Sequence, residues 1–414
     1  MDRGPGSRVL AVMGSGETSP TMVTVHRALA ARLAASRPTA VLLDTPYAFQ
    51  ENAADVSARA RAYFARSVGL DVTIAPGGAA ALRTADWVFS GPGSPTYALS
   101  RWQEDGTAQA LRDRVATRPG VTVMASAAAA TIGCAALPVY EIYKAGAAPH
   151  WRDGLDLMAL CGLRVTVIPH YDNAEGGTHD TRYCYLGERR LTLLERDLPS
   201  AAAVLGVDEH TAVIIDLDAG QAEITGRGTL TVRRHGHSIV LPSGTVIPLT
   251  ELRFLARHGP SGAGRISGPS GNAARAELTA GPGPVATLPE ITQEAAGRFD
   301  AAATARDAHG MTAVVLDLEA AISDWGADTE EDQGTEQSRA VLRGLITRLG
   351  EAVGAVPDPA GRLAAAAGPL LSLRSDLRSQ GLYPAADAIR DALTAAGVLI
   401  QETAEGTHWT LPRR

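Results

Sequence analysis

The stretch that decides the fold reads Val121-Thr122-Val123-Met124-Ala125-Ser126-Ala127-Ala128-Ala129-Ala130. Its first five residues form an apolar run typical of a buried strand, and the alanines that follow Ser126 favour a helix. A serine on such a strand-to-helix turn projects its hydroxyl above the sheet, where the N–H groups that open the helix can stabilise an oxyanion. The alternative is an ordinary helix N-cap, for which serine is among the best residues.

Similar apolar runs alternate with helical stretches on both sides of this turn. The alternation predicts a parallel α/β sheet built from the runs Val9–Met13, Ala40–Leu43, Val72–Ala75, Trp87–Phe89, Val121–Met124 and Val165–Ile168. Three later runs are separated by Asp-Ala-Gly and Gly-Arg-Gly turns, which predicts an antiparallel meander closing the domain: Ala212–Asp216, Glu223–Thr225 and Leu230–Arg233.

Composition divides the chain into three parts. Residues 258–289 are rich in Gly, Pro, Ser and Ala and predict a flexible linker. We therefore expect an α/β domain at 1–257 and a C-terminal module at 290–414, where the apolar pattern indicates helices only.

The 414 residues, 45% of them apolar, are enough for two or three domains with proper cores. The N-terminus has no apolar signal region, and no run approaches the roughly 18 apolar residues of a membrane span, so we expect a cytoplasmic protein. Three cysteines without paired spacing predict neither a disulfide framework nor a structural zinc site.

Charge is distributed unevenly. Residues 285–414 hold eleven arginines against nineteen acidic residues, a formal charge of −8, although the whole chain carries −7. This C-terminal part therefore lacks the basic footprint of a nucleic-acid-binding surface. Lys144 is the only lysine in the sequence, which we attribute to compositional bias.

The loops after the predicted strands hold the candidate site, because chemistry gathers at the carboxyl ends of strands in an open parallel sheet. The loop Gly14–Pro20 lacks both the lysine of a P-loop and the third glycine of a dinucleotide fingerprint. The loop Ser90–Thr96 contains Gly91 and Gly93, which let the backbone approach a ligand and donate an N–H to an oxyanion.

Ionisable residues are densest after Val165–Ile168, from Pro169 to Tyr183. A general base for Ser126 requires a histidine held by a carboxylate, and His170 with the Asp208–Glu209 pair supplies both. A solvated loop histidine and a turn carboxylate pair are the alternatives. The spacing of His170, His179, Asp180 and Cys184 matches no zinc signature, so we expect no metal and no cofactor.

These loops together resemble the cyanophycinase and aspartyl dipeptidase type of serine peptidase, which has the class I glutamine amidotransferase-like (flavodoxin-like) fold. The resemblance covers about residues 8–235 and rests on three segments: Met124–Ala128, Ile168–Tyr171 and Gly206–Ala212. It implies that Ser126 is the nucleophile, His170 the base and Glu209 the residue that orients it. It also implies oxyanion donors in Gly91, Gly93 and Ala127.

The sequence departs from the family pattern at three places, one of which is Pro169, where the family has a glutamine before the histidine. Met124 and Ala128 stand where the family elbow has glycines. An insertion from Ala174 to Arg190 follows the histidine, and with the preceding Asn173 it supplies expected substrate contacts. We expect Asn173 and His179 to line the pocket and Arg182 to clamp a substrate carboxylate. An internal salt-bridge network is the alternative for the insertion.

The C-terminal stretch from about 290 to 412 resembles the C-terminal, anticodon-side domain of cysteinyl-tRNA synthetases. The likeness is clearest from Tyr383 to Leu393 and from Gly397 to Trp409. It implies tRNA binding, for which Arg374, Arg378 and Arg390 are the candidate contacts, whereas the −8 charge favours a bundle for protein contacts. None of the catalytic signatures of a synthetase is present, which excludes aminoacylation.

The sequence thus predicts a serine hydrolase of a peptide, isopeptide or amide bond that acts on a small substrate, with no membrane partner and an oligomer possible. One alternative is a binding protein whose elbow only caps a helix and whose C-terminal module carries the interaction. Another combines the two and predicts a hydrolase of an aminoacyl or peptidyl group presented by tRNA.

Overall fold

The computed structural model describes residues 6–75, 78–259, 285–326, 334–354, 359–403 and 406–410. The chain divides into two compact units, one of Met1–Gln293 with Leu318–Arg339 and one of Glu294–Asp317 with Ala340–Arg414. Residues 260–284, most of the predicted linker at 258–289, lie outside the described residues, and the flexibility of the linker remains a prediction. No helix in the described ranges is long and apolar enough to cross a membrane.

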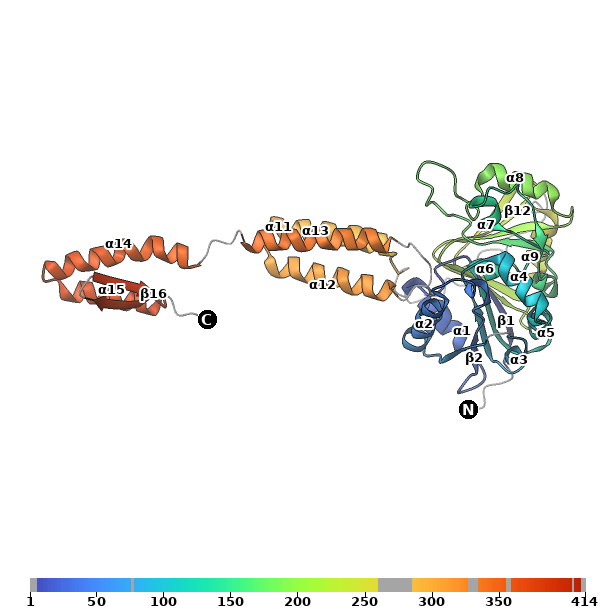
Figure 1. The fold of residues 1–414 in the computed structure, drawn as a ribbon, viewed down its shortest axis with the longest axis horizontal. Coiled ribbons are helices and arrows are strands. Elements are labelled where there is room, and N and C mark those ends of the chain that lie inside the picture. Colours follow the sequence, from blue (N-terminus) through green and yellow to red (C-terminus); the bar gives the residue numbers. More distant parts are fainter. Residues whose placement is uncertain are drawn as a thin grey trace, which may run out of the picture. The chain divides into compact units, whose positions relative to one another are not determined.

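A mixed sheet forms the centre of the first unit (Figure 1). In the described part of the chain it has eight strands, and five of them are parallel in the order β1–β5–β4–β2–β3. These are β1 (Arg8–Met13), β5 (Gly120–Ala125), β4 (Trp87–Ser90), β2 (Ala40–Leu42) and β3 (Val72–Ile74). Three antiparallel strands continue the sheet beyond β1, namely β10 (Thr211–Asp216), β11 (Gln221–Gly226) and β14 (Val246–Pro248).

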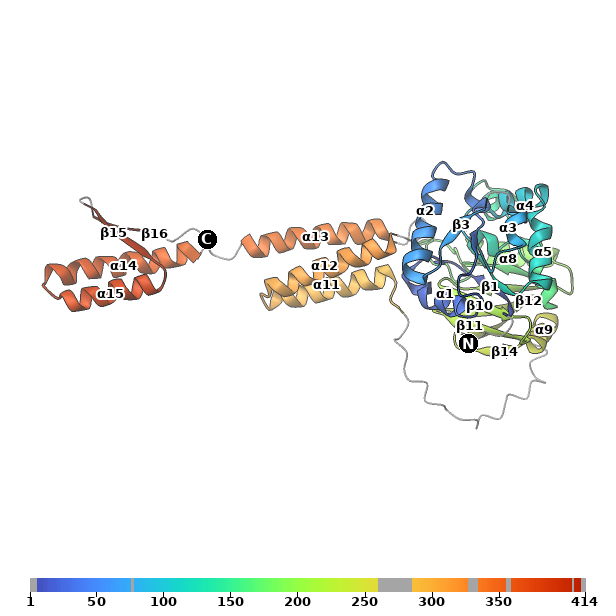
Figure 2. The same cartoon turned by 90° about the horizontal axis from the view of Figure 1, so that it is seen from below.

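Both faces of the parallel part are apolar and covered by helices, as a parallel sheet requires. On β1, Val9 and Met13 belong to the cluster that packs on one face, whereas Leu10 and Val12 belong to the cluster on the other. Figure 2 shows α1 and α2 on one side and α3, α4 and α5 on the other. Their bounds are α1 Val23–Ala30, α2 Ala53–Tyr63, α3 Ala79–Leu82, α4 Pro95–Glu104 and α5 Thr107–Thr117.

A second sheet corrects part of the predicted topology. β8 (Val165–Ile168) does not join the central sheet but pairs in parallel with β9 (Ala203–Val207). β12 (Thr229–Arg234) pairs with β9 and with β13 (His237–Pro242), so the predicted meander ends after β11. The apolar runs identify the strands correctly but not their partners, because pairing depends on residues distant in sequence.

The remaining elements of the first domain are short or lie beside the second sheet. They are α6 (Ser126–Ala129), β6 (Ala135–Ala136), α7 (Val139–Tyr143), β7 (Arg152–Asp153), α8 (Gly187–Asp197), α9 (Leu249–His258) and the short helical turns η1 Pro20–Met22, η2 Thr45–Tyr47, η3 Phe64–Val68 and η4 Leu157–Cys161.

The C-terminal region is helical, as predicted. Its helices are α11 (Leu288–Thr304), α12 (Ala308–Trp325), α13 (Thr335–Gly354), α14 (Pro359–Ser379) and α15 (Tyr383–Ala395). The pattern of helices alone is incomplete, since the region ends in an antiparallel hairpin of β15 (Leu399–Thr403) and β16 (Gly406–Thr410). A small apolar cluster centred on Ala367, Leu371, Leu393 and Val398 packs α14, α15 and the hairpin together.

Candidate active site

Ser126 occupies the predicted turn between β5 and α6. Its backbone φ is +47°, a left-handed conformation that non-glycine residues adopt rarely and at a cost in energy. The N-cap of α6 is Ala125, which makes no side-chain capping bond. The helix-cap alternative for Ser126 is therefore wrong, and its nearly buried hydroxyl is directed elsewhere.

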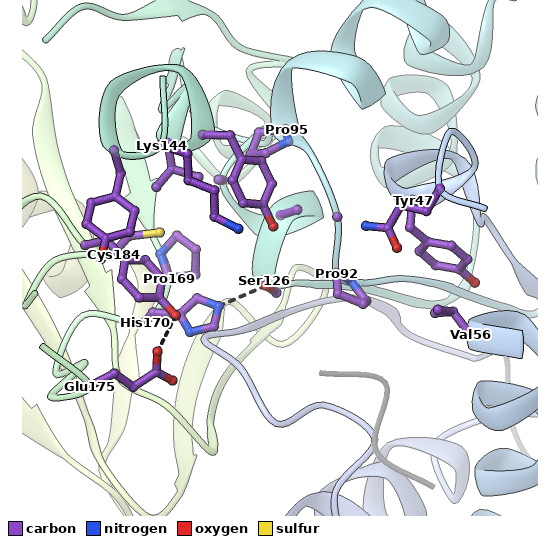
Figure 3. A pocket seen from close by; sticks show the side chains of 18 residues that line it. Tyr47, Val56, Pro92, Pro95, Ser126, Lys144, Pro169, His170, Glu175 and Cys184 are labelled. Carbon is purple, nitrogen blue, oxygen red and sulfur yellow. Dashed lines mark hydrogen bonds between the residues drawn. The ribbon is translucent and has the colours of Figure 1, made fainter. Parts of the chain in front are cut away.

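The hydroxyl of Ser126 meets the ring of His170, as Figure 3 shows. Ser126 Oγ lies 2.9 Å from His170 Nε2, which is within hydrogen-bond distance. His170 also has a positive φ, +47°, two residues beyond the end of β8. The two residues that share this hydrogen bond thus both have a strained backbone, and such strain is often found at functional sites.

Glu209 lies on the other side of the imidazole. Its Oε1 is 3.0 Å from His170 Nδ1. The parallel register of β8 and β9 explains this proximity, because Ile168 is opposite Gly206 and the two loops leave the sheet side by side. A carboxylate can only accept, so Nδ1 carries the proton and Nε2 accepts the hydrogen bond from Ser126.

Two further hydrogen bonds fix Glu209. Asn173 Nδ2 donates to Glu209 Oε1 at 3.1 Å, and the Glu209 backbone N–H donates to Asp172 Oδ1 at 2.7 Å. Burial raises the pKa of the Glu209 carboxyl, but the hydrogen bond and charge of His170 and the bond from Asn173 more than offset it, so the pKa is lowered. Glu209 is accordingly anionic at neutral pH.

The loop after β4 lies beside the turn at Ser126, since β4 and β5 are parallel neighbours with Ser90 opposite Met124. The Ala128 N–H donates to the Gly91 carbonyl at 3.1 Å, which ties the loop to α6. Gly93 has a φ of +127°, and a Cβ there would lie 2.2 Å from the Pro46 carbonyl oxygen. Gly93 and Ala127 line the cavity at Ser126, whereas Gly91, also expected to donate to an oxyanion, is not among the described residues that line it.

That cavity has a volume of about 360 Å³, enough for a small peptide fragment. Much of its wall comes from residues that the sequence analysis did not select, among them Tyr47, Tyr140, Tyr143 and Lys144. Tyr185 also lines it and donates its hydroxyl to Glu175 Oε2 at 2.8 Å. Burial and this carboxylate both raise the pKa of Tyr185, so the hydroxyl keeps its proton.

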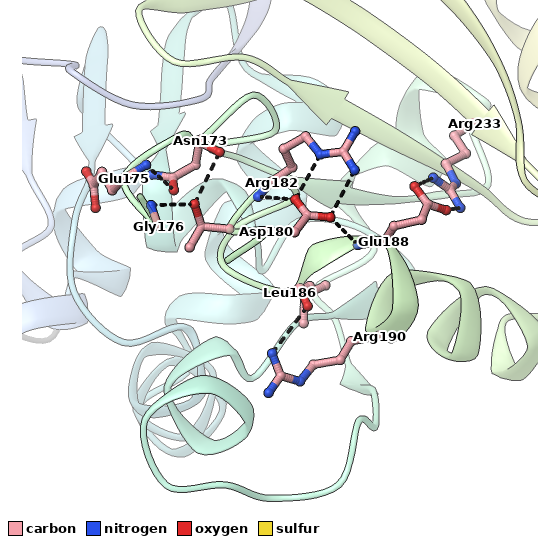
Figure 4. A network of polar contacts seen from close by, with 10 residues as sticks. Asn173, Glu175, Gly176, Asp180, Arg182, Leu186, Glu188, Arg190 and Arg233 are labelled. Carbon is pink, nitrogen blue, oxygen red and sulfur yellow. Dashed lines mark hydrogen bonds and ion pairs between the residues drawn. The ribbon is translucent and has the colours of Figure 1, made fainter. Parts of the chain in front are cut away.

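The residues of the insertion that line the cavity are not the ones that the sequence predicts. Figure 4 shows the polar contacts that the predicted residues make instead. Asn173 is buried and contacts Glu209, which makes it a support for the carboxylate. His179 is exposed, and neither it nor Arg182 is among the described residues that line the cavity. The Arg182 guanidinium instead donates to both oxygens of Asp180, at 2.8 and 2.9 Å.

The expected clamp is therefore replaced by the internal salt-bridge alternative. Asp180 also accepts the N–H of Glu188 at the start of α8, and its hydrogen bonds with Arg182 lower its pKa. Glu188 pairs in turn with the buried guanidinium of Arg233 on β12. Glu188 thus anchors the insertion to the second sheet, while Arg182 bonds within the insertion. A dense run of charges in the sequence does not by itself distinguish such a network from substrate binding.

No group of three or more His, Cys, Asp or Glu side chains in the described ranges is arranged to hold a metal ion. All three cysteines fall within these ranges, where no disulfide joins them, and Cys184 lines the cavity.

Comparison with known proteins finds two kinds of likeness. No protein-family model matches the chain. Over 42 residues the chain is 52% identical to the cysteine–tRNA ligase of Thermosipho melanesiensis, which is 10% of this chain and 9% of the ligase. The chain thus spans about a tenth of the length of that curated relative.

Two solved structures are similar to part of the chain. A peptidase from an acI-B1 Actinobacterium has a TM-score of 0.48 and 16% identity, covering 59% of this chain and 98% of that one. A putative peptidase E protein from Listeria monocytogenes EGD-e has a TM-score of 0.38 and 14% identity, covering 53% of this chain and 99% of that one. The fold is mixed α/β with a mostly parallel central sheet and a helical C-terminal region.

Proposed function

We propose that the first domain is a serine hydrolase that cleaves a peptide or amide bond in a small substrate. The observation that carries this proposal is the continuous hydrogen-bonded series from Ser126 through His170 to Glu209, with bonds of 2.9 and 3.0 Å at the edge of a cavity. A nucleophile, a base and a residue that orients the base are the parts that such catalysis requires. The sequence resemblance to serine peptidases supports the same roles.

In the first step Ser126 Oγ attacks the substrate carbonyl while His170 Nε2 takes the hydroxyl proton. A bond forms between Oγ and the carbonyl carbon, and the carbonyl oxygen takes the negative charge. The anionic carboxylate of Glu209 stabilises the imidazolium that forms. His170 then passes its proton to the leaving nitrogen as the carbon–nitrogen bond breaks, which leaves an acyl ester on Ser126.

The N–H groups of Gly93 and Ala127 are the proposed donors to the oxyanion, because both residues line the cavity beside Ser126. The N–H of Ala128 is already bonded to the Gly91 carbonyl. Water then attacks the acyl ester with His170 as base, which releases the acid and restores Ser126.

A fluorophosphonate probe tests the proposal directly, because it reacts with activated serines. We expect it to label the wild-type protein at Ser126 and to fail with Ser126→Ala. Ser94→Ala is the matched control, since Ser94 caps α4 by accepting the Tyr97 N–H at 3.2 Å and should not affect labelling. Absence of labelling in the wild type, or its persistence in Ser126→Ala, would contradict the proposed nucleophile.

As a second function we propose tRNA binding by the C-terminal region, because its sequence resembles that end of cysteinyl-tRNA synthetases and the chain has a 42-residue match to a cysteine–tRNA ligase. The arginines expected to contact phosphate have acidic partners, however. Arg374 and Arg378 pair with Glu402, at 2.6 and 3.4 Å, and Arg390 pairs with acids of its own helix. Their charge is thus largely balanced, and any affinity should be modest and strongly dependent on salt.

Filter binding of total tRNA to the full chain tests this second function. We expect tRNA to bind at about 20 mM salt, where counterion release favours binding strongly. The same binding should disappear at physiological ionic strength. No binding at low salt would leave the region as a surface for protein contacts. Binding with turnover of an aminoacyl ester would instead favour the combined activity, a hydrolase acting on a group that tRNA presents.

A further inference from the structure

The only lysine of the chain lies in the cavity with Ser126. The other 37 of the 38 Lys and Arg residues are arginines, so compositional bias explains why lysine is absent elsewhere but not why a lysine stands at this position. Lys144 follows α7 directly, and its backbone N–H donates to the Tyr140 carbonyl, which closes the helix. Its amine lies 4.7 Å from the centre of the Tyr140 ring. Figure 3 shows the side chain directed into the cavity towards Ser126.

The amine of Lys144 is available to a ligand. In the described part of the chain no carboxylate lies within ion-pair distance of it, and Glu175, the acid that lines the same cavity, accepts the Tyr185 hydroxyl instead. A lysine ammonium is a compact point charge on a flexible stem, whereas the planar arginine fork needs room for two parallel hydrogen bonds. A lysine is therefore suited to a single anionic group held close to a reacting centre.

The position of Lys144 relative to the catalytic residues indicates which anionic group this is. In Figure 3 Lys144 and His170 lie on the same side of Ser126, while Pro92 and Tyr47 lie on the other. The leaving nitrogen must be on the His170 side, because His170 gives it a proton. In a peptide whose last residue is released, the free α-carboxylate is only two bonds from that nitrogen.

We propose that Lys144 is the residue that binds the free C-terminal carboxylate of the residue that leaves, so that this carboxylate, next to the leaving nitrogen, raises the rate of cleavage. This specificity rests on the proposed function of Ser126. The cavity encloses a small volume, about 360 Å³, which agrees with a substrate that ends near the scissile bond.

The kinetic test compares a library of Xaa-Ala dipeptides with the matching Xaa-Ala amides, which lack the terminal charge. For the wild type we expect kcat/KM to be about tenfold higher for the acid, a moderate factor because Lys144 is solvent-exposed and its ion pair is partly screened. Lys144→Met should remove the difference by raising KM for the acid only, and Lys144→Arg should restore part of it. Arg196→Met, which removes an exposed charge from α8, is the control and should keep the full preference.

Two kinetic results would overturn the assignment. One is an equal rate for acid and amide in the wild type. The other is a Lys144→Met variant that loses activity only towards acidic Xaa residues, whether or not the C-terminus is amidated, because the lysine would then bind the acyl side chain.

A binding test separates this proposal from the proposed hydrolysis. Because Lys144 is the only lysine, its modification by trinitrobenzenesulfonate is read from a single peptide by mass spectrometry. In Ser126→Ala, which cannot turn over, we expect Ala-Ala to protect Lys144 and Ala-Ala amide to fail. Equal protection by both, or by neither, would overturn the role of Lys144 even if the wild type proves to be a hydrolase. Protection by the acid alone would support it even if no turnover is found.

Discussion

Replacing Ser126 by glycine should stabilise the protein relative to its replacement by alanine, although under the proposed function we expect neither variant to hydrolyse substrate. Ser126 has a φ of +47°, and an L-residue in the left-handed region costs roughly 1–2 kcal/mol. Glycine escapes this cost but loses more freedom on folding, about 0.5–1 kcal/mol. Both variants lose the bond to His170 equally. The backbone cost that glycine avoids is larger than the entropy cost that it adds, which makes Ser126→Gly more stable than Ser126→Ala by about 0.5–1 kcal/mol.

Urea denaturation of the full chain, followed by the fluorescence of the buried Trp87 and Trp102, measures this difference. The matched control is Ser90, which ends the neighbouring strand β4 and donates its hydroxyl to the Leu43 carbonyl at 3.0 Å. In that extended position the order should reverse, with Ser90→Gly less stable than Ser90→Ala. If Ser126→Ala is as stable as Ser126→Gly, the turn stores no strain and the reasoning about the nucleophile's backbone is refuted.

Three further outcomes follow from individual contacts. Asn173→Ala should lower kcat about tenfold with little change in KM, because it removes a bond that orients Glu209 and touches no substrate; steady-state kinetics would show it. Burial lowers the pKa of His26 to about 4, so only the unfolded chain takes up a proton between pH 6.5 and 4, and stability is lost as the pH falls through that window. The free energy of unfolding in urea should thus fall by about 2 kcal/mol more between pH 7 and 5 in the wild type than in His26→Gln. Arg182→Gln should leave KM unchanged, since the guanidinium is bonded to Asp180, and a raised KM would return it to substrate binding.

The parts of the fold that depend on local pattern could be predicted from the sequence. Five apolar runs became the parallel strands of the central sheet because a strand buried on both faces needs apolar residues throughout. The position of loops at strand ends, together with the family resemblance, predicts that Ser126 and His170 lie close together. Each loop alone is weak evidence for a site, but three such loops indicate the same one.

The partner of β8 could not be predicted, because pairing is a long-range property. Its neighbour β9, at Ala203–Val207, follows only after the insertion and α8. A sequence window that identifies a buried strand contains no information about which sheet receives it. The same limit applies to Lys144, which no motif selects and which enters the cavity only because α7 ends there.

The turn at Ser126 forms although both of its family glycines are absent. Met124 and Ala128 are fully buried in the apolar cluster on the side of α3, α4 and α5, so their side chains stabilise the core. The Ala128 N–H still reaches the Gly91 carbonyl at 3.1 Å. A Cβ at these two positions is therefore compatible with both the packing and the hydrogen bonding of the turn.

The close approach of backbone that the site needs is supplied by the facing loop instead. A Cβ on Gly91 would lie 2.7 Å from Glu17 Oε1, and one on Gly93 would lie 2.2 Å from the Pro46 carbonyl oxygen, distances that real side chains do not adopt. The Glu17 carboxylate ends a flexible side chain that can shift, but the Pro46 carbonyl belongs to the backbone, so glycine is required at position 93 and not on either side of Ser126. An oxyanion site needs backbone donors held close to the nucleophile. The small residues that permit this approach can lie either in the turn at Ser126 or in the facing loop after β4. The loss of glycine from the elbow is for this reason no evidence against a working nucleophile.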